Sequence, residues 1–452
     1  MEPSAALDAL HRFRLSLYEC FDRRTDALLE LTDALLTAGV VPSPVHLSLE
    51  ASHRRGWGSL YAALSRGRID EDAMRELVAH CPLAEDRTPR VYAVDVSVWS
   101  RCDAEASPER GFYYHPSRHS AGQPIVAGWA YQWIAQLGFA HDGWVAPMDV
   151  VRVRPKENAN EVAAGQVKGL LRRLPEWCER EEEAPLFVFD AGYDPVQLQQ
   201  GLEGYCAQLL VRLRTGRCFY ADPPPPKRTG RPPRHGRKLD CKDPKTWPTP
   251  SAEHHCEAPG YGSVRVRTWA GLHPKIQDHP TRGTRLPRPI VRGTLVLVEV
   301  TRLPRPTREP RALWLWWSGG DTGEPDLDLL WRAYARRFDL EHTFRFLKQT
   351  LGWTTPRVRH PEQADRWSWL MLAAFTQLRL ARMCVADRRL PWERHYAPGR
   401  LTPHRVRRAV LALLLEIGTP AEPPKPCGRS PGGSKGRRSG RAKRYPALKK
   451  TA

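Results

Sequence analysis

The stretch from Arg90 to Leu213 constrains the fold most, because its hydrophobic period alternates between that of strands and that of helices. Runs of alternating or continuous apolar residues are separated by segments in which apolar residues recur every three or four positions. The pattern predicts, in order, three strands, a helix, a strand, a short helix and a strand: 91–98, 125–133, 144–153, 158–174, 186–190, a helix from 195, and 208–213. Such an order is typical of a mixed α/β sheet flanked by helices.

Two carboxylates in this region stand where burial is costly. Asp95 interrupts an apolar strand, and Asp190 ends another. A buried aspartate destabilises the fold unless a partner compensates its charge, and a divalent cation is such a partner. Each aspartate alone is also explained as a strand-end cap or a turn former. Because ligands bind at the carboxyl ends of strands in open α/β sheets, the pair predicts a binding site there.

A third acid lies in a segment with a helical pattern that begins near Asp326. Tyr334 is followed by Arg337, Glu341 and Lys348 at offsets of 3, 7 and 14 residues. At about 100° per residue, these four side chains lie within a band about 60° wide on one helix. In an isolated helix, these four side chains could instead simply form a solvent-exposed face with ion pairs one turn apart. Beside two strand acids, this face predicts an enzyme that cuts a phosphodiester.

Three carboxylates on one scaffold of sheet and helix suit hard metal ions. They would hold two Mg²⁺ ions about 4 Å apart, and Mn²⁺ can take the place of Mg²⁺. Magnesium prefers oxygen ligands and needs no cage of histidine and cysteine. The 10 cysteines accordingly form no CxxC pair. The nearest cluster of zinc-type ligands, Cys241, His254, His255 and Cys256, lacks a second spaced pair, so the pattern does not favour a zinc site.

The charge of the chain favours a polyanionic partner. Its 70 lysines and arginines exceed its 50 aspartates and glutamates, which gives a net charge of +20 over 452 residues. Nucleic acid is the commonest partner of such a chain, and a generally basic soluble protein is the alternative. The sequence shows no secretory signal and no apolar run of the ~20 residues that cross a membrane, so we expect a soluble intracellular protein.

The sequence divides into five parts. Residues 1–88 are predicted to form helices with clustered arginines, which are either a DNA-reading module or a packing domain. Residues 89–213 and 326–420 carry the three acids and apolar helices that cover the sheet. Residues 214–325 combine a basic, proline-rich loop with strand-like runs, which predicts a β-rich insertion. Residues 421–452 form a basic tail whose composition predicts disorder.

These motifs together resemble the DDE transposases of bacterial insertion sequences. The four residues of the helical motif match the Tyr-x2-Arg-x3-Glu-x6-Lys signature of one branch at every spacing. The blocks Val94-Asp95-Val-Ser and Asp190-Ala-Gly-Tyr match the two acidic blocks of the family. The likeness runs from Arg12 to Ile417 and is closest to an actinobacterial subgroup of DDE superfamily endonucleases. The composition, rich in arginine and alanine, suits a high-GC bacterium.

The resemblance implies an RNase H-like catalytic core in which Asp95, Asp190 and Glu341 ligate two Mg²⁺ ions. It implies cut-and-paste transposition, in which double-stranded DNA is cleaved at terminal inverted repeats and joined to target DNA by a homodimer or larger synaptic complex. No membrane takes part, and the expected location is the bacterial cytoplasm, at the nucleoid. The DNA contacts that the resemblance implies come from Tyr334, Arg337, Arg345, Lys348 and, by stacking on a flipped base, Trp314.

Two features limit this transfer. Relatives often carry arginine where this chain has Ala191, so one phosphate contact is absent here. For Trp314, packing in the core is the alternative to base stacking, because the residue lies in an alternating strand. Two other functions also stay open: an inactive or domesticated copy that only binds DNA, and a plain nuclease without strand transfer.

Overall fold

The computed structural model describes residues 3–41, 43–83, 89–114, 124–140, 142–174, 184–225, 233–275, 290–304, 309–319, 325–397, 399–426 and 440–449. The chain forms two compact units. The first unit consists of Met1–Glu85, Val96–Asn158 and Asp339–Ala452, and the second consists of Asp86–Asp95 and Ala159–Phe338.

The first unit contains most of the helices. They are α1 (Pro3–Glu19), α2 (Thr25–Thr37), α3 (Pro44–Leu47), α4 (Trp57–Arg66), α5 (Glu71–Ala79), α9 (Phe338–Gln349), α10 (Pro361–Ala381) and α11 (Pro403–Ile417). Its strands are β1 (Phe21–Arg23), β2 (Arg68–Ile69), β4 (Gly111–Tyr114), β5 (Ile125–Leu137), β6 (Val145–Val153) and the second half of β3 (Val91–Ser100). Strand β5 has β3 as a neighbour and pairs antiparallel with β4 and β6, while β1 pairs antiparallel with β2.

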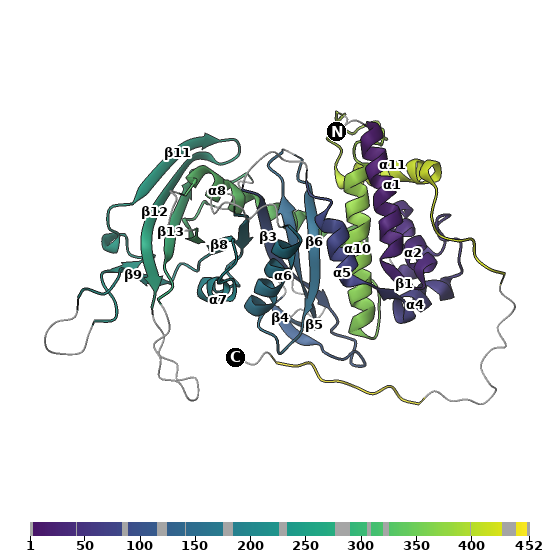
Figure 1. The fold of residues 1–452 in the computed structure, drawn as a ribbon, viewed down its shortest axis with the longest axis horizontal. Coiled ribbons are helices and arrows are strands. Elements are labelled where there is room, and N and C mark those ends of the chain that lie inside the picture. The colour runs from purple at the N-terminus through teal and green to yellow at the C-terminus, as the bar shows by residue number, and fades with distance from the viewer. Residues whose placement is uncertain are drawn as a thin grey trace. The chain divides into compact units, whose positions relative to one another are not determined.

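Helix α10 is the core of the first unit. It contacts α1, α2, α4, α11 and strand β6 (Figure 1). Every residue from Trp367 to Arg379 is buried, so the helix is surrounded on all sides rather than along one stripe. The N-terminal helices that the sequence predicted therefore pack on a helix from the far end of the chain.

A buried ion pair joins these helices. Arg14 of α1 is 1% exposed and donates two hydrogen bonds to the carboxylate of Asp33 on α2, at 2.6 and 3.0 Å. The same guanidinium donates to Gln377 Oε1 on α10 at 2.7 Å and to the carbonyl of Gly418 at 3.2 Å. The bidentate geometry and the two further acceptors satisfy a charge that burial alone would make costly.

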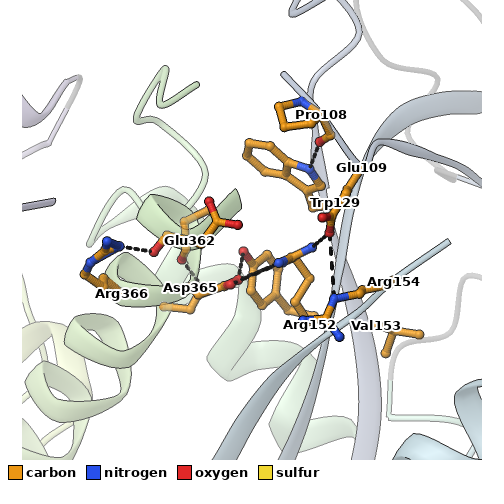
Figure 2. A network of polar contacts seen from close by, with 12 residues as sticks. Pro108, Glu109, Trp129, Arg152, Val153, Arg154, Glu362, Asp365 and Arg366 are labelled. Atoms are coloured by element: carbon orange, nitrogen blue, oxygen red, sulfur yellow. Dashed lines mark hydrogen bonds and ion pairs between the residues drawn. The ribbon is translucent and has the colours of Figure 1, made fainter. Parts of the chain in front are cut away.

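A second polar network ties strand β6 to α10 (Figure 2). Arg152 of β6 donates from Nε to Asp365 of α10 at 2.9 Å and from Nη1 to Glu109 at 2.5 Å. The hydroxyl of Tyr131 on β5 donates to the same Asp365 at 2.8 Å. Both carboxylates therefore share one arginine, whose own side chain is 6% exposed.

The second unit is built on parallel strands that lead into an antiparallel sheet. The first half of β3 lies parallel to β7 (Leu186–Phe189), and β7 lies parallel to β8 (Gln208–Arg212). Strand β8 then pairs antiparallel with β14 (Leu313–Ser318). The remaining antiparallel strands are β13 (Gly293–Val300), β12 (Gly262–Pro274), β11 (Ala252–Ala258), β9 (Cys218–Tyr220) and β10 (Lys238–Asp240). The helices are α6 (Ala159–Arg173), α7 (Pro195–Gly201), α8 (Leu327–Arg336) and a 3₁₀ turn at Pro244–Thr246.

The fold is thus a mixed α/β fold with a large mixed sheet flanked by helices, as the sequence predicted, and this arrangement is compatible with an RNase H-like fold. The predicted strands and helices between Arg90 and Leu213 are all present. Asp326 caps α8 with its side chain, at the helix start that the sequence predicted, and Asp70 caps α5 in the same way. Among the described residues, no helix has both the length and the apolarity needed to cross a bilayer.

Two helical predictions are wrong in detail. Residues 1–88 are not entirely helical as predicted, because the chain forms the short strand β1 and Arg24 adopts a left-handed conformation with φ of 62°. The helix expected from Asp326 onward is interrupted at Arg337 and becomes α8 and α9. The band of about 60° calculated for a continuous helix therefore applies only within each of these two helices.

The C-terminal segment from 440 to 449 lies along the loop before β4. The amide of Tyr445 donates to the carbonyl of Glu105 at 2.8 Å, and the amide of Leu448 donates to the carbonyl of Arg110 at 2.7 Å. Leu448 also forms a parallel bridge with Gly111. The part of the predicted disordered tail between these residues and 426 lies outside the described residues.

Candidate active site

Strands β3 and β7 bring the two predicted aspartates to the same level. The parallel pairing runs from Val91 opposite Leu186 to Val94 opposite Phe189. The next residue along the chain is an aspartate in both cases: Asp95 lies within β3, and Asp190 directly follows β7. Neighbouring strands lie about 4.8 Å apart, so the two carboxylates start from adjacent backbone positions.

Asp95 is held by an arginine from helix α8. Arg337, the C-cap of α8, donates from Nη1 to Asp95 Oδ2 at 2.6 Å. The side chains are 10% exposed for Arg337 and 14% exposed for Asp95. A short, mostly buried and charge-assisted hydrogen bond of this kind is among the stronger ones in proteins and fixes the position of the Asp95 carboxylate.

Asp190 is held by a tight turn rather than by a cation. Its Oδ1 accepts a hydrogen bond from the amide of Gly192 at 2.8 Å. A Cβ atom at Gly192 would lie 3.0 Å from that same oxygen, so glycine lets the turn close against the carboxylate. Within the described residues, no lysine or arginine pairs with the Asp190 carboxylate, so the backbone holds it and leaves its charge uncompensated.

Tyr193 is a buried phenol whose pKa is influenced by both aspartates. Its side chain is buried, and burial raises the pKa of the phenol well above its usual value; Asp95 and Asp190 both raise it further, while Arg337 opposes them. The phenol therefore stays protonated, and it lies in the field of both carboxylates. Tyr193 lies within the Asp190-Ala-Gly-Tyr block, but it was not among the predicted site residues; its position three residues after the acid is the signal that points to it.

The remaining motif residues lie in different elements. Tyr334 of α8 has the Arg337 guanidinium over its ring, 5.8 Å from the ring centroid. Lys348 of α9 donates from Nζ to the carbonyl of Val98 at 3.1 Å and lies 5.7 Å from the ring centroid of Trp353. Arg345 is exposed. The structure thus brings Asp95, Asp190 and Arg337 together.

Glu341 is the one predicted acid outside the second unit. It is half-buried in the first turn of α9. Its place beside the two aspartates stays a prediction.

Trp314 is part of a tryptophan cluster in the second unit. It is 2% exposed and packs against Trp247 and Trp269, with ring centroids 5.2 and 5.5 Å away. This placement favours core packing over base stacking, because a base cannot reach a ring that other rings cover.

The clustered arginines near the N-terminus also have internal partners. Arg54 and Arg55 both pair with Glu30, which is 0% exposed, and Arg55 also pairs with Asp26 at 3.0 Å. These arginines hold α2 against the loop before α4. They favour the packing alternative for this part of the chain, and its role in DNA reading stays a prediction.

An arginine-lined cavity in the first unit is a better candidate for phosphate contacts. It has a volume of about 670 Å³ and is lined by Arg101, Arg357, Arg359, Arg441 and Arg444, together with Asp103 and Glu105. Arg101 is 8% exposed, and burial lowers the pKa of its guanidinium while Asp103 opposes the shift. Its Nε makes no hydrogen bond within the described part of the chain. Arginines gathered at this density favour an anionic ligand.

Comparison with protein families identifies the chain. The model of the family described as DDE superfamily endonuclease matches residues 16–275, which include Asp95 and Asp190 and end before Glu341. Comparison with curated proteins gives no significant match. Membership of the family implies a nuclease that acts on DNA with divalent metal ions, typically Mg²⁺. Because the match covers more than half of the chain and contains the paired aspartates, this protein belongs to the DDE superfamily endonucleases.

Proposed function

We propose that this chain is the transposase of a bacterial insertion sequence and moves its element by cut-and-paste transposition. Membership of the endonuclease family, the paired aspartates and the net charge of +20 support this function. The substrate is double-stranded DNA at the terminal inverted repeats, and the product is the element joined to target DNA. A homodimer brings the two ends together.

Asp95, Asp190 and Glu341 are the proposed metal ligands. Their oxygen donors fit Mg²⁺, which prefers carboxylates and retains waters. When bound, Mg²⁺ would polarise the scissile phosphate and lower the pKa of the attacking water or 3′-hydroxyl. Asp190 has no basic partner among the described residues and is available to a metal ion, whereas Asp95 has to exchange its contact with Arg337.

Arg337 has two roles in this proposal. Before the metal and DNA bind, it neutralises Asp95 and limits its repulsion of Asp190. When DNA is bound, the same guanidinium is released to a phosphate, together with Tyr334, Arg345 and Lys348. The arginine-lined cavity of the first unit then holds a more distant part of the DNA backbone.

The domain organisation follows from the same proposal. The RNase H-like core comprises residues 89–213 and 326–420, and residues 214–325 are the insertion between the second aspartate and Glu341. Residues 1–88 and the basic tail at 421–452 assist in binding DNA.

The alignment of Asp95 with Asp190 on neighbouring parallel strands carries the proposal. A cleavage assay tests it with a labelled duplex that contains the inverted repeats flanking the gene, in the presence of Mg²⁺. The proposal expects nicking at the repeat and joining of the exposed 3′ end to a second duplex. Nicking without joining would instead indicate a plain nuclease, and binding without nicking would indicate an inactive, DNA-binding copy.

A further inference from the structure

Three side chains with metal-binding atoms meet in the second unit, apart from the acids discussed above. His254 and Cys256 are two residues apart on β11 and therefore point to the same face of the strand. Asp328 lies in the first turn of α8, which contacts β11. The ligand atoms of the three residues all lie within 4.8 Å of one another.

The distances are close to those of a tetrahedral zinc site. His254 Nε2 lies 3.6 Å from Asp328 Oδ1, and Cys256 Sγ lies 3.9 Å from the same oxygen. Zinc bonds of about 2.0–2.3 Å at tetrahedral angles place neighbouring ligand atoms roughly 3.3–3.6 Å apart. The third pair, His254 Nε2 and Cys256 Sγ, lies within 4.8 Å, so the ligand atoms have to move closer together before one ion can reach all three.

One nitrogen in this cluster makes no hydrogen bond within the described part of the chain, although its side chain is only 33% exposed and the nearest ion-pair oxygen, Asp328 Oδ1, is 3.6 Å away. His254 Nε2 is buried and makes no hydrogen bond to any residue that the structure describes. Buried polar atoms of native proteins almost always have a partner, and a metal ion is one that protein atoms alone do not reveal. This observation is independent of the spacing of the three residues.

The surroundings of Asp328 are those of a metal-binding carboxylate. Trp331 donates from Nε1 to Asp328 Oδ1 at 3.1 Å, and Arg332 donates from Nε to the same oxygen at 2.9 Å. Such outer partners fix the orientation of a ligand and keep it charged.

We propose that His254, Cys256 and Asp328 form a Zn²⁺ site that fastens α8 to β11. One imidazole, one thiolate and one carboxylate suit zinc, whereas Mg²⁺ does not favour a sulfur ligand. The fourth position is left to water. The Cys256 proton passes to solvent when the ion binds. Because α8 ends at Arg336 and its cap Arg337 pairs with Asp95, the ion would also steady the helix that positions Arg337.

The sequence did not favour a zinc site around Cys241, His254, His255 and Cys256, and two of these four residues are indeed elsewhere. His255 points to the opposite face of β11, where it pairs with Glu253, and Cys241 follows β10. The third ligand comes from Asp328, which is 72 residues beyond Cys256. Only the fold brings it to the strand.

Cobalt binding to the full chain tests this proposal. After removal of metal with a chelator, Co²⁺ is added as a coloured probe, and Zn²⁺ is then added to displace it. We expect one equivalent of Co²⁺ to give the visible bands of a tetrahedral site together with a thiolate charge-transfer band, and one equivalent of Zn²⁺ to remove both. Cys256→Ser should abolish the charge-transfer band, and His254→Gln should weaken zinc binding by about 100-fold.

Two matched variants serve as controls. His255→Gln alters the neighbouring histidine on the other face of β11, and Cys218→Ser alters a thiol that also lies beside a carboxylate, 3.3 Å from Asp240. Both should bind Co²⁺ like the unaltered chain. Circular dichroism establishes that each variant is folded, and Zn²⁺ should raise the melting temperature of the unaltered chain but not of Asp328→Asn.

A thiolate band that persists in Cys256→Ser, or a Co²⁺ spectrum without such a band, would overturn the zinc site. In that case His254 and Asp328 form only an ion pair. The ligands proposed for Mg²⁺ are all carboxylates, so Co²⁺ bound there would give no thiolate band. The outcome of the cobalt experiment therefore does not depend on whether the chain cleaves DNA.

Discussion

Two arginine–aspartate pairs show how a structural contact differs from a prepared site. In the first unit, Arg152 binds both neighbouring carboxylates, Asp365 and Glu109, and every charge has a partner (Figure 2). In the second unit, Arg337 binds Asp95, whereas among the residues that the structure describes Asp190 has no lysine or arginine partner and accepts a hydrogen bond from the Gly192 amide. A network that serves stability satisfies its charges, whereas a carboxylate left without a cation is ready to receive one.

The first prediction concerns Asp190, for which we expect the largest effect. Asp190→Asn keeps the hydrogen bond from Gly192 and removes the charge. We expect cleavage with Mg²⁺ to fall by about 10³-fold, equivalent to about 4 kcal/mol, with little change in melting temperature. The measurement is the rate of nicking of the labelled repeat duplex.

Glu203→Gln is the control for that variant, because it removes an exposed carboxylate just beyond α7 in the same unit. It should cleave normally. Normal cleavage by Asp190→Asn would show that the charge of Asp190 is not needed for a metal.

The second prediction concerns Asp365, where the cost is to stability rather than to activity. Asp365→Ala leaves Arg152 buried with one carboxylate fewer. We expect a loss of about 3–5 kcal/mol in the free energy of unfolding, measured by urea denaturation. Cleavage per folded molecule should be unchanged, and a stable variant that cannot cleave DNA would reverse the roles assigned to the two networks.

The third prediction separates metal binding from catalysis at Arg337. Arg337→Gln removes the cation that competes for Asp95, so Mn²⁺ should bind the free protein about tenfold more tightly in a titration followed by electron paramagnetic resonance. Cleavage should nevertheless fall by about 10²-fold, because a phosphate contact is lost. Weaker binding of Mn²⁺ would show that Arg337 supports the metal site instead of competing with it.

The fourth prediction concerns the arginine-lined cavity and is the smallest. A chain that ends at residue 439 lacks Arg441 and Arg444 but retains both networks. In a plot of the logarithm of the DNA-binding constant against the logarithm of the salt concentration, we expect the slope to become roughly two to four units less steep. DNA that is bound should still be cleaved at the normal rate. A chain that ends at Lys449 is the control and should show the full slope; a full slope in both would remove the cavity from the DNA-binding surface.

The strands and the position of the two aspartates followed from local patterns. The run from Val91 to Val98 has the alternation of a strand, and Asp190 ends an apolar run, so the sequence alone predicts both acids at strands of a mixed sheet. The parallel register that aligns them is a long-range property. It depends on the crossover between β3 and β7, which no local pattern encodes.

Other features depend on partners that are distant in sequence. Strand β11 was not predicted, because its residues Ala252–Ala258 are mostly polar and its apolar support comes from β12. The pairing of Arg14 with Gln377 spans 363 residues. The sequence also does not predict that the helix beginning near Asp326 is interrupted at Arg337, because the spacing of the motif fits an unbroken helix equally well.

The central claim is that Asp95, Asp190 and Glu341 hold the catalytic metal together. Crystals of the full chain with Mn²⁺ and a duplex carrying the element's end test it directly, because anomalous scattering locates manganese without assumptions about its ligands. We predict manganese within bonding distance of a carboxylate oxygen from each of the three acids. Manganese bound by the two aspartates while Glu341 faces elsewhere would contradict the claim.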